Sequence, residues 1–437
     1  MKKNSKVLFL LFTRNKRSGI IEEKKSGKDS GMENRVIFHI DVNSAYLSWE
    51  AVRRLQDLGE TLDLRTIPSA VGGDVSKRHG IILAKSIPAR KYNIQTGEPV
   101  VDALRKCPNL VLVPPDHQLY AKNSHAFMEI LRKYSDVVEQ YSIDEAFMDM
   151  TGTAGLFGDP VTAAARIKDE IFRELGFTVN VGVSSNKLLA KMAGDLKKPN
   201  LVHTLFPDEI AKKMWPLPIR DLFLVGKASE EKLHSMGIRT IGDLANADIT
   251  ALKSILKKHG EIIWNYANGR DTSAVEASPA DNKCYGNSTT VAFDVTDAET
   301  AKMVLLSLAE QVGWRLRKDS VWIEEVSVAI RYHDLSYTSH QSMLKAPTNI
   351  TKEIYDKACV LFGELWDGRP IRLLGIQTGR VSKDSGNRQL DLFDSADYKK
   401  LEKLDEAIDS IRTKFGADSV MRASFLKQDR IKHINSK

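Results

Sequence analysis

The chain has 437 residues, of which 42% are hydrophobic and 28% are charged. This composition is ordinary for a folded globular protein and excludes disorder over the whole length. The length predicts roughly two to four domains of about 100–200 residues each. No apolar run approaches the about 20 residues that a membrane-spanning helix needs, which argues against an integral membrane protein.

The formal net charge of +7 is concentrated near the N-terminus. Residues 1–31 hold nine Lys or Arg and three Asp or Glu, a net charge of +6, so the remaining chain carries only +1. Overall charge is therefore no argument for nucleic-acid binding, and local patches must supply one. The apolar run at residues 7–12 is too short for a signal peptide. We expect residues 1–31 to be a disordered basic leader, or to precede a true start at Met32.

Cysteine usage predicts a reducing, cytoplasmic environment. Cys107, Cys284 and Cys359 lie far apart, and no pair has the spacing of a metal or redox site. A sparse, odd set also argues against a disulfide framework.

The first half of the chain has the pattern of a split βαβ, ferredoxin-like sheet. Ser44 and Asp159 are expected to cap helices at their N-termini, and Gly176 is expected to end the second helix. The predicted order is strand, helix, strand, strand, helix, strand and helix, over residues 36–41, 44–55, 137–141, 146–150, 160–174, 178–183 and 186–196.

The second half mixes short helices with a further α/β region. Pro216, Pro218 and Gly226 interrupt the short helices, and a polar linker follows at residues 276–283. Residues 284–382 contain a predicted helix and strands, at 298–316, 325–332 and 371–381. The stretch at 383–395 is polar and predicted to be flexible. A last amphipathic helix is predicted from Leu401, Leu404, Ile408, Ile411 and Phe415.

Three acidic residues fall at predicted strand ends. Asp41 ends the first strand, and Asp144 and Glu145 lie at a strand junction later in the chain. Central strands of a ferredoxin-like sheet are neighbours, so these carboxylates can meet and would then need a counter-charge. A pair of Mg²⁺ ions would supply it and would permit in-line nucleotidyl transfer. An acidic pair at a turn is more often solvated surface, so these residues alone leave both interpretations open.

The surrounding motifs resemble those of Y-family translesion DNA polymerases, the UmuC/DinB-like or ImpB/MucB/SamB family. They are Y-S-I-D-E-A at residues 141–146, I-D-V-N-S-A-Y at 40–46, G-V-S-S-N-K-L-L-A-K at 182–191 and D-L-K-K-P-N at 195–200. The resemblance covers about residues 33–425 and implies an α+β, multidomain right-hand polymerase. Its expected parts are a ferredoxin-like palm (32–50 and 116–203), small fingers (51–115), a helix-hairpin-helix thumb (204–275), a linker (276–283), an α/β little finger (284–382) and a clamp-binding tail with its amphipathic helix (383–437).

The resemblance also implies roles for individual residues. The catalytic carboxylates and metal ligands would be Asp41, Asp144 and Glu145, joined by the carbonyl of Val42 and holding two Mg²⁺, with Mn²⁺ as a substitute. Nucleotide-binding residues would be Ser44, Ala45, Tyr46, Arg90 and Lys198.

Within this set, Tyr46 falls at the steric-gate position, where an aromatic ring excludes a 2′-hydroxyl by clash. Arg90 and Lys198 would contact the triphosphate. The alternatives are that Tyr46 packs in the core and that Arg90 and Lys198 are ordinary solvated surface cations. The stretch I-P-A-R at residues 87–90 replaces the better-known Y-E-A-R, and Ala84 replaces a hydroxyl residue, which predicts a UmuC-like bacterial subgroup.

Several segments resemble DNA- and partner-binding elements. Val225, Gly226 and Lys227 lie in a hairpin-like stretch that would bind DNA phosphates through backbone N–H groups, unless it is a plain helical turn. In the little finger, the candidate phosphate contacts are Lys283, Arg315, Arg317, Arg331 and Arg380.

The tail contains a pentapeptide, Q-L-D-L-F, that matches the peptide bound by the bacterial sliding clamp, which is also called the β subunit. Its residues are Gln389, Leu390, Asp391, Leu392 and Phe393. Apolar side chains of such a tethered peptide fill a pocket on the partner. The alternative is that they pack on the body of this chain as a strand.

The expected function is template-directed addition of dNTPs to a primer 3′-OH, with low fidelity and without proofreading, during DNA damage bypass, repair and the SOS response. The expected partners are primer-template DNA, dNTPs and the clamp, for a monomer that is not bound to membrane and is associated with the nucleoid. One alternative is a catalytically idle clamp- and DNA-binding accessory protein, which predicts loss of a metal carboxylate. Another is a palm-type nucleotide cyclase, which would not need a template.

Overall fold

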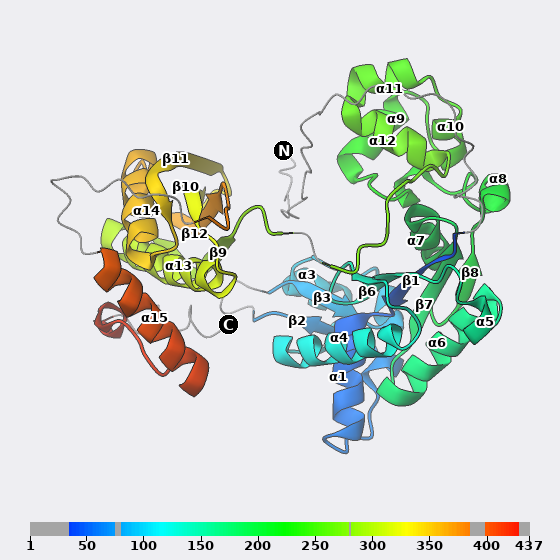
Figure 1. Ribbon diagram of the computed structural model, residues 1–437, viewed down its shortest axis with the longest axis horizontal. Coiled ribbons are helices and arrows are strands. Elements are labelled where there is room, and N and C mark those ends of the chain that lie inside the picture. Colours follow the sequence, from blue (N-terminus) through cyan, green and yellow to red (C-terminus); the bar gives the residue numbers. More distant parts are fainter. Residues whose placement is uncertain (1–34, 75–79, 279–280, 385–397, 428–437) are drawn as a thin grey trace. The chain divides into compact units, whose positions relative to one another are not determined.

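The computed structural model describes residues 35–74, 80–278, 281–384 and 398–427. Two compact units are built mainly from residues 35–73 with 81–278 and from the described residues after 280. Figure 1 labels most of their helices and strands. No helix in the described ranges is long and apolar enough to cross a membrane.

The first unit is centred on a five-stranded sheet. Its strands are β5 (Val138–Gln140), β6 (Glu145–Asp149), β1 (Ile37–Val42), β7 (Val179–Ser184) and β8 (Val202–Thr204), in that spatial order. The first four run antiparallel to their neighbours, and β8 is parallel to β7. The predicted ferredoxin-like arrangement is therefore present, with β8 added at one edge.

Helices cover both faces of this sheet. Helices α4 (His117–Arg132) and α6 (Pro160–Leu175) share one apolar core with Phe38 and Ile40 of β1. Helix α7 (Lys187–Asp195) packs on β7 and β1 from the opposite face. Because side chains alternate along a strand, His39 and Asp41 point to the opposite face, which α7 covers.

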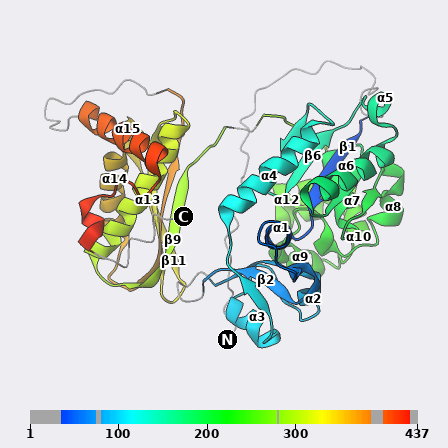
Figure 2. The same ribbon diagram turned by 90° about the horizontal axis from the view of Figure 1, so that it is seen from below.

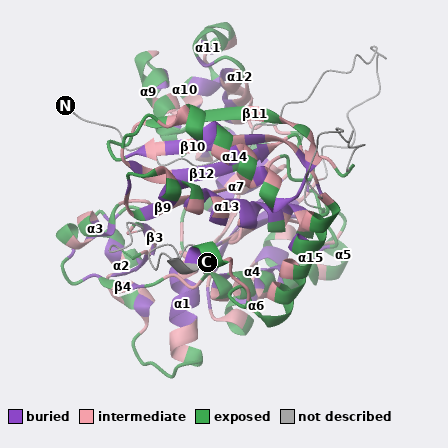
Figure 3. Ribbon diagram, turned by 90° about the vertical axis from the view of Figure 1, so that its left-hand side faces the viewer, coloured by how far each residue is buried: buried purple, intermediate pink, exposed green. Residues whose placement is uncertain are grey.

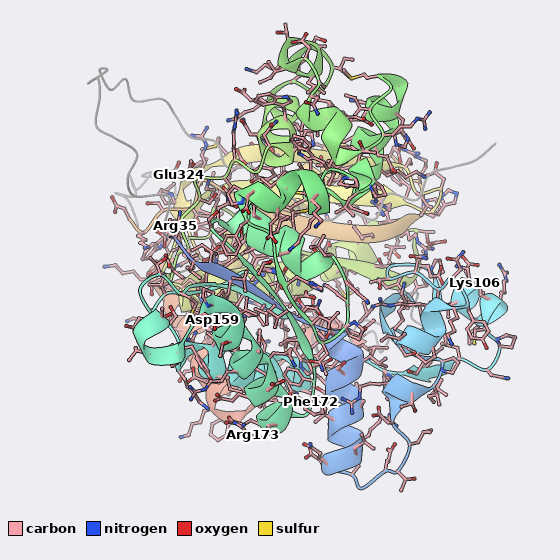
Figure 4. All side chains as sticks on the ribbon, turned by 90° about the vertical axis from the view of Figure 1, so that its right-hand side faces the viewer. Arg35, Lys106, Asp159, Phe172, Arg173 and Glu324 are labelled. Atoms are coloured by element: carbon pink, nitrogen blue, oxygen red, sulfur yellow. The ribbon has the colours of Figure 1, made fainter. Side chains whose placement is uncertain are left out.

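The termini of α6 follow the prediction. The Asp159 carboxylate accepts hydrogen bonds from the backbone N–H groups of Val161 and Thr162 at 3.0 and 3.1 Å. Gly176 ends the helix at φ 74°, which glycine adopts without strain. Figure 4 labels Asp159 at one end of α6 and Phe172 and Arg173 towards the other.

Helix α1 (Ala45–Gln56) departs from the prediction at its first residue. Ser44 does occupy the N-cap position, but its backbone is left-handed, with φ 49°, and its side chain makes no capping hydrogen bond. At this turn out of β1, the Asn43 backbone N–H donates to the Thr178 carbonyl at 3.0 Å. Ser44 is therefore the N-cap residue, as predicted, but its side chain does not cap the helix.

A small three-stranded sheet and a helical region complete the first unit. The sheet has the order β3 (Ile82–Lys85), β2 (Ser69–Gly72) and β4 (Val111–Val113), with the short helices η1 (Leu64–Thr66), α2 (Ile87–Arg90) and α3 (Val100–Lys106). Further short helices are α5 (Ala154–Phe157), η3 (Pro207–Glu209), α8 (Ile210–Lys213), η4 (Ile219–Asp221), α9 (Lys227–Ser235), α10 (Ile241–Ala245), α11 (Ile249–Leu256) and α12 (Lys258–Ala267). Leu188, Leu189 and Met192 of α7 share a core with the helices after residue 209.

The second unit is a four-stranded antiparallel sheet backed by helices. Its order is β11 (Tyr337–Thr348), β10 (Ile323–Tyr332), β12 (Ile371–Gly379) and β9 (Gly286–Val295). Helices α13 (Ala298–Lys318) and α14 (Thr351–Leu365) cover one face, as Figure 2 shows. The sequence prediction located α13, β10 and β12 but not β9, β11 or α14.

Helix α15 (Tyr398–Phe415) exists as predicted but packs through charged rather than apolar side chains. Leu404, Ile411 and Phe415 are 48%, 38% and 67% exposed, whereas Asp405 is 5% exposed. Arg317 of α13 pairs with Asp405 at 3.1 Å and with Asp409 at 2.6 Å. Figure 3 shows α15 with largely exposed and intermediate residues. The short helix η5 (Ala423–Lys427) follows.

Candidate active site

Three acidic residues meet at one end of the five-stranded sheet. Asp41 and Glu145 are direct partners in the β1–β6 register. The backbone N–H of Val42 donates to the carbonyl of Asp144 at 2.9 Å, so Asp144 lies at the same junction. The sheet therefore brings together carboxylates that are about 100 residues apart in the chain, as the topology predicts.

The electrostatics of the three carboxylates differ. Burial raises the pKa of Asp144, and the charges of Asp41 and Glu145 raise it further despite a hydrogen bond from Ser142. For Glu145, burial opposes ionisation, but the hydrogen bond from His39 and the charge of Lys191 outweigh it and lower the pKa to about 2. Glu145 therefore stays ionised to a lower pH than Asp144 does.

Two lysines supply positive charge to this cluster. Lys191 of α7 donates a hydrogen bond to Oε2 of Glu145, and Lys198 donates one to Oδ2 of Asp41. Lys198 also pairs with Asp195 at 3.0 Å. Burial disfavours the Lys198 ammonium, but the charges of Asp41 and Asp195 outweigh it and raise its pKa. Both lysines therefore neutralise carboxylates that would otherwise repel one another.

In the described ranges, no three Asp, Glu, His or Cys side chains are already grouped as ligands of a metal ion. The donor chemistry of the site nevertheless fits a hard divalent cation, because adjacent carboxylates are its preferred ligands. The mutual repulsion at Asp144 and the two lysine pairs show that positive charge is needed there. The residues that would hold such a cation are Asp41, Asp144, Glu145 and the carbonyl of Val42.

Tyr46 lies at the start of α1 next to these carboxylates. Its ring stacks on that of Tyr120 and also contacts Trp49. Burial raises the pKa of Tyr46, and the nearby charge of Asp144 adds to this effect. Ala45 is buried, while Ser44 forms the left-handed turn that leads from β1 into the helix.

A buried amide network holds the segment that carries Lys198. Asn43 Oδ1 accepts the backbone N–H of Asn200 at 3.0 Å, and Asn43 Nδ2 donates to Asn180 at 3.2 Å. Asn180 in turn donates to the carbonyl of Lys197 at 2.6 Å. The position of Lys198 beside Asp41 is therefore fixed by the end of β1 and by β7.

The other predicted contacts have more varied surroundings. Arg90 is exposed at the end of α2 and does not contact the three carboxylates in the described part of the chain. Val225 is buried, Gly226 is the N-cap residue of α9, and Lys227 is exposed. Gln389, Leu390, Asp391, Leu392 and Phe393 lie outside the described residues.

In the second unit, the predicted cations fall into two groups. Lys283 and Arg380 are exposed, and Arg331 projects from β10 on the side away from its buried residues. Arg315 donates to the carbonyl of Gly286 at 2.5 Å. Arg317 is paired with Asp405 and Asp409, so its predicted phosphate contact gains no support and stays a prediction.

Three residues at the site were missed by the sequence interpretation. His39 precedes Asp41 by two positions on the same strand, so alternation alone could have placed it on the same face. Lys191 lies inside a motif that was noted only for its resemblance. Tyr120 stands on α4, and nothing in its local sequence indicates that it supports Tyr46.

Comparison with known proteins gives a consistent family. Residues 40–195 match the impB/mucB/samB family, and residues 282–392 match the C-terminal domain of that family. Residues 220–271 match the thumb domain of DNA polymerase-iota.

Whole-chain relatives are named DNA polymerase IV. The protein of Clostridium acetobutylicum is 45% identical over 91% of this chain and 99% of its own length. DNA polymerase IV 1 of Bacillus subtilis is 36% identical over 92% of this chain and 95% of its own. The predicted UmuC-like subgroup gains no support from these names and stays a prediction.

A solved Y-family DNA polymerase chimera has the same fold. Its TM-score is 0.68 at 24% identity, covering 79% of this chain and 99% of the chimera. This likeness confirms the predicted fold class, and the whole-chain relatives and family models confirm the predicted family. The chain belongs to the impB/mucB/samB family and is a Y-family, translesion-type DNA polymerase.

Proposed function

We propose that the enzyme adds dNTPs to a template-paired primer 3′-OH at the carboxylates Asp41, Asp144 and Glu145. The observation that carries this assignment is the direct pairing of Asp41 with Glu145, with Asp144 bonded beside Val42. Y-family polymerases depend on divalent cations, and we propose Mg²⁺ as the ion, with Mn²⁺ as a substitute. Two such ions, when bound, lower the pKa of the attacking hydroxyl and neutralise the pyrophosphate leaving group.

The chain's own residues would position the triphosphate. Lys198 is shared between Asp41 and Asp195, and an incoming phosphate with its cations would compete with both carboxylates for that ammonium. The Lys198 ammonium would then bind the phosphate, and the cations would neutralise Asp41 in its place. Arg90, exposed at the end of α2, is the second proposed phosphate contact.

Tyr46 would exclude ribonucleotides. Its ring is held from behind by Tyr120, which is fully buried, and therefore cannot retreat to admit a 2′-hydroxyl. Ser44 and Ala45, at the turn before it, would approach the nucleotide through the backbone.

The domains proposed for this enzyme follow the family. The five-stranded sheet is the palm (32–50 and 116–203), the three-stranded sheet belongs to the fingers (51–115), and the α8–α12 region is the thumb (204–275). After the 276–283 linker, the four-stranded sheet is the little finger (284–382). Val225, Gly226 and Lys227 would bind DNA phosphates in the thumb, and Lys283 and Arg331 would do so in the little finger.

The pentapeptide at residues 389–393 would bind the bacterial sliding clamp, the β subunit. Such tethering raises the effective concentration of the polymerase at the primer end. We further propose a monomer that acts in DNA repair in the cytoplasm, at the nucleoid, under the SOS response, and that copies with low fidelity and without proofreading.

Primer extension tests the proposal directly. Undamaged and abasic templates are copied with Mg²⁺ and single dNTPs by the wild type and by an Asp144→Ala/Glu145→Ala double variant. We expect template-dependent extension by the wild type and none by the double variant, with both proteins folded by circular dichroism. Extension by the double variant would contradict the carboxylate assignment. Failure of the folded wild type, even with clamp, would contradict autonomous polymerisation.

A further inference from the structure

A buried histidine touches the proposed metal site without being one of its proposed ligands. His39 is 1% exposed, and its Nε2 lies 2.8 Å from Oε2 of Glu145. An ionised carboxylate can only accept hydrogen bonds, so Nε2 must carry the hydrogen and donate it. The bond therefore fixes both the tautomer of His39 and the position of one oxygen of Glu145.

The sheet geometry explains why His39 reaches Glu145. His39 and Asp41 are two residues apart on β1 and so point to the same face. Asp41 is paired with Glu145 and His39 with Phe147, which makes His39 and Glu145 diagonal neighbours on adjacent strands. The Phe147 ring lies 4.7 Å from the imidazole and restrains it from the side.

Close packing of α7 restrains the imidazole from above. A Cβ atom at Gly194 would lie 3.3 Å from Nδ1 of His39, and one at Gly182 would lie 1.9 Å from the Ala190 carbonyl oxygen. Both glycines thus permit the helix to lie directly on β1 and β7. The ring is held on two sides and has little freedom to rotate.

The second ring nitrogen makes this arrangement costly. In the described part of the chain, Nδ1 of His39 is buried and has no hydrogen-bond partner. An unpaired buried polar atom destabilises a fold, because it loses its hydrogen bond to water without gaining another. An apolar side chain would fill the same space without that cost, so packing alone does not account for an imidazole here. The Nε2–Glu145 bond is the feature that an apolar residue would lose.

We propose that His39 is a positioning residue that holds Oε2 of Glu145 and so presents the carboxylate to the divalent cations. The inference rests on the proposed assignment of Glu145 as a metal ligand. Lys191 also bonds Oε2, but it is an ammonium on a flexible stem, and an arriving cation would repel it. His39 is the contact that remains to orient Glu145 when metal is bound.

The test measures metal binding with catalysis blocked. Mn²⁺ is titrated into the full-length enzyme with a dideoxy-terminated primer-template and the next dNTP, and free Mn²⁺ is followed by electron paramagnetic resonance. His39→Leu removes the donor at similar volume, and we expect it to weaken Mn²⁺ binding roughly 10-fold. His39→Gln returns an N–H donor at the same reach and should restore most of the affinity. Phe38→Leu, which removes packing volume on the opposite face of β1 and keeps the hydrogen bond, is the matched control and should bind as the wild type does.

Thermal melting without metal shows whether each variant is folded. Equal Mn²⁺ affinity in folded His39→Leu and wild type would overturn the positioning role alone. So would a folded His39→Gln that binds as weakly as His39→Leu. If the wild type binds Mn²⁺ no better than the Asp144→Ala/Glu145→Ala variant, the proposed metal site itself is overturned, and the role of His39 with it.

Discussion

The ring of Tyr46 stacks on the ring of Tyr120 with centroids 4.5 Å apart and an interplanar angle of 13°. Tyr46 lies in the first turn of α1 and Tyr120 belongs to α4, so two helices from distant parts of the chain determine the position of the Tyr46 ring. Tyr120 is fully buried and also contacts Trp49 and Glu50. The proposed steric gate therefore has a rigid support rather than a free rotamer.

Removing the gate ring should relax sugar discrimination. Tyr46→Ala leaves an open space where a 2′-hydroxyl would otherwise clash, and we expect the ratio of ribonucleotide to deoxynucleotide incorporation to rise on the order of 100-fold. Single-nucleotide insertion with rNTP and dNTP in parallel measures that ratio. Tyr46→Phe keeps the ring and its stack and serves as the control. An unchanged ratio in Tyr46→Ala would contradict the gate assignment.

Loss of the Lys198 ammonium should weaken nucleotide binding. Lys198→Met retains most of the side-chain length but removes the charge-assisted hydrogen bond proposed for the triphosphate. We expect the KM for dNTP to rise about 10-fold. Steady-state insertion kinetics give KM and kcat separately.

The adjacent Lys197 provides a matched control because its side chain is exposed. Lys197→Met changes the net charge by the same amount and should leave the KM for dNTP within about twofold of the wild type. Equal increases in both variants would indicate a general charge effect and would count against a specific role for Lys198.

The buried ion pairs under α15 predict a large stability effect. Asp405 accepts the backbone N–H of Thr351 at 2.8 Å and pairs with Arg317, and its side chain is 6% exposed. Asp405→Ala removes the buried partner of Arg317 and leaves it paired only with Asp409, which should lower the free energy of unfolding of the second unit by about 3 kcal/mol. Urea denaturation followed by tryptophan fluorescence measures this change.

An exposed ion pair in the same unit serves as the comparison. Lys352 and Asp356 are 2.7 Å apart on α14, with side chains more than half exposed. Asp356→Ala should cost less than about 0.5 kcal/mol, because exposed pairs contribute little. A similar effect of both substitutions would mean that the Asp405 network is not a significant restraint on α15.

The ferredoxin-like sheet was predictable because local signals agreed with its topology. Asp159 and Gly176 mark both ends of α6, and the alternating strands place Asp41 and Glu145 at neighbouring strand ends. The three carboxylates could therefore be located from the sequence. Their environment was only partly predictable. Strand alternation places His39 on the same face as Asp41, but Lys191 reaches Glu145 only through the packing of α7 on the sheet.

The second unit was less predictable for a different reason. Strand β11 is at the edge of its sheet and has only one buried residue, so its sequence lacks apolar alternation. The packing of α15 depends on Arg317 and Asp405, which are 88 residues apart. Each residue alone predicts an ordinary surface charge. Long-range ion pairing has no local signature in the sequence. The apolar stripe of α15 suggested that its apolar face packs on the protein, whereas its acidic face does.

The proposed clamp peptide predicts a loss that affects processivity but not chemistry. Leu392→Ala/Phe393→Ala removes the two side chains expected to fill the clamp pocket, while the active-site residues are unchanged. We expect basal single-nucleotide insertion to equal that of the wild type, and clamp-stimulated extension on a long primed template to fall about 10-fold or more. Asp391→Ala alters the variable position of the peptide and should retain stimulation. If the double variant is still stimulated by the clamp, another surface of the chain must bind it, because tethering through this peptide would then contribute nothing measurable.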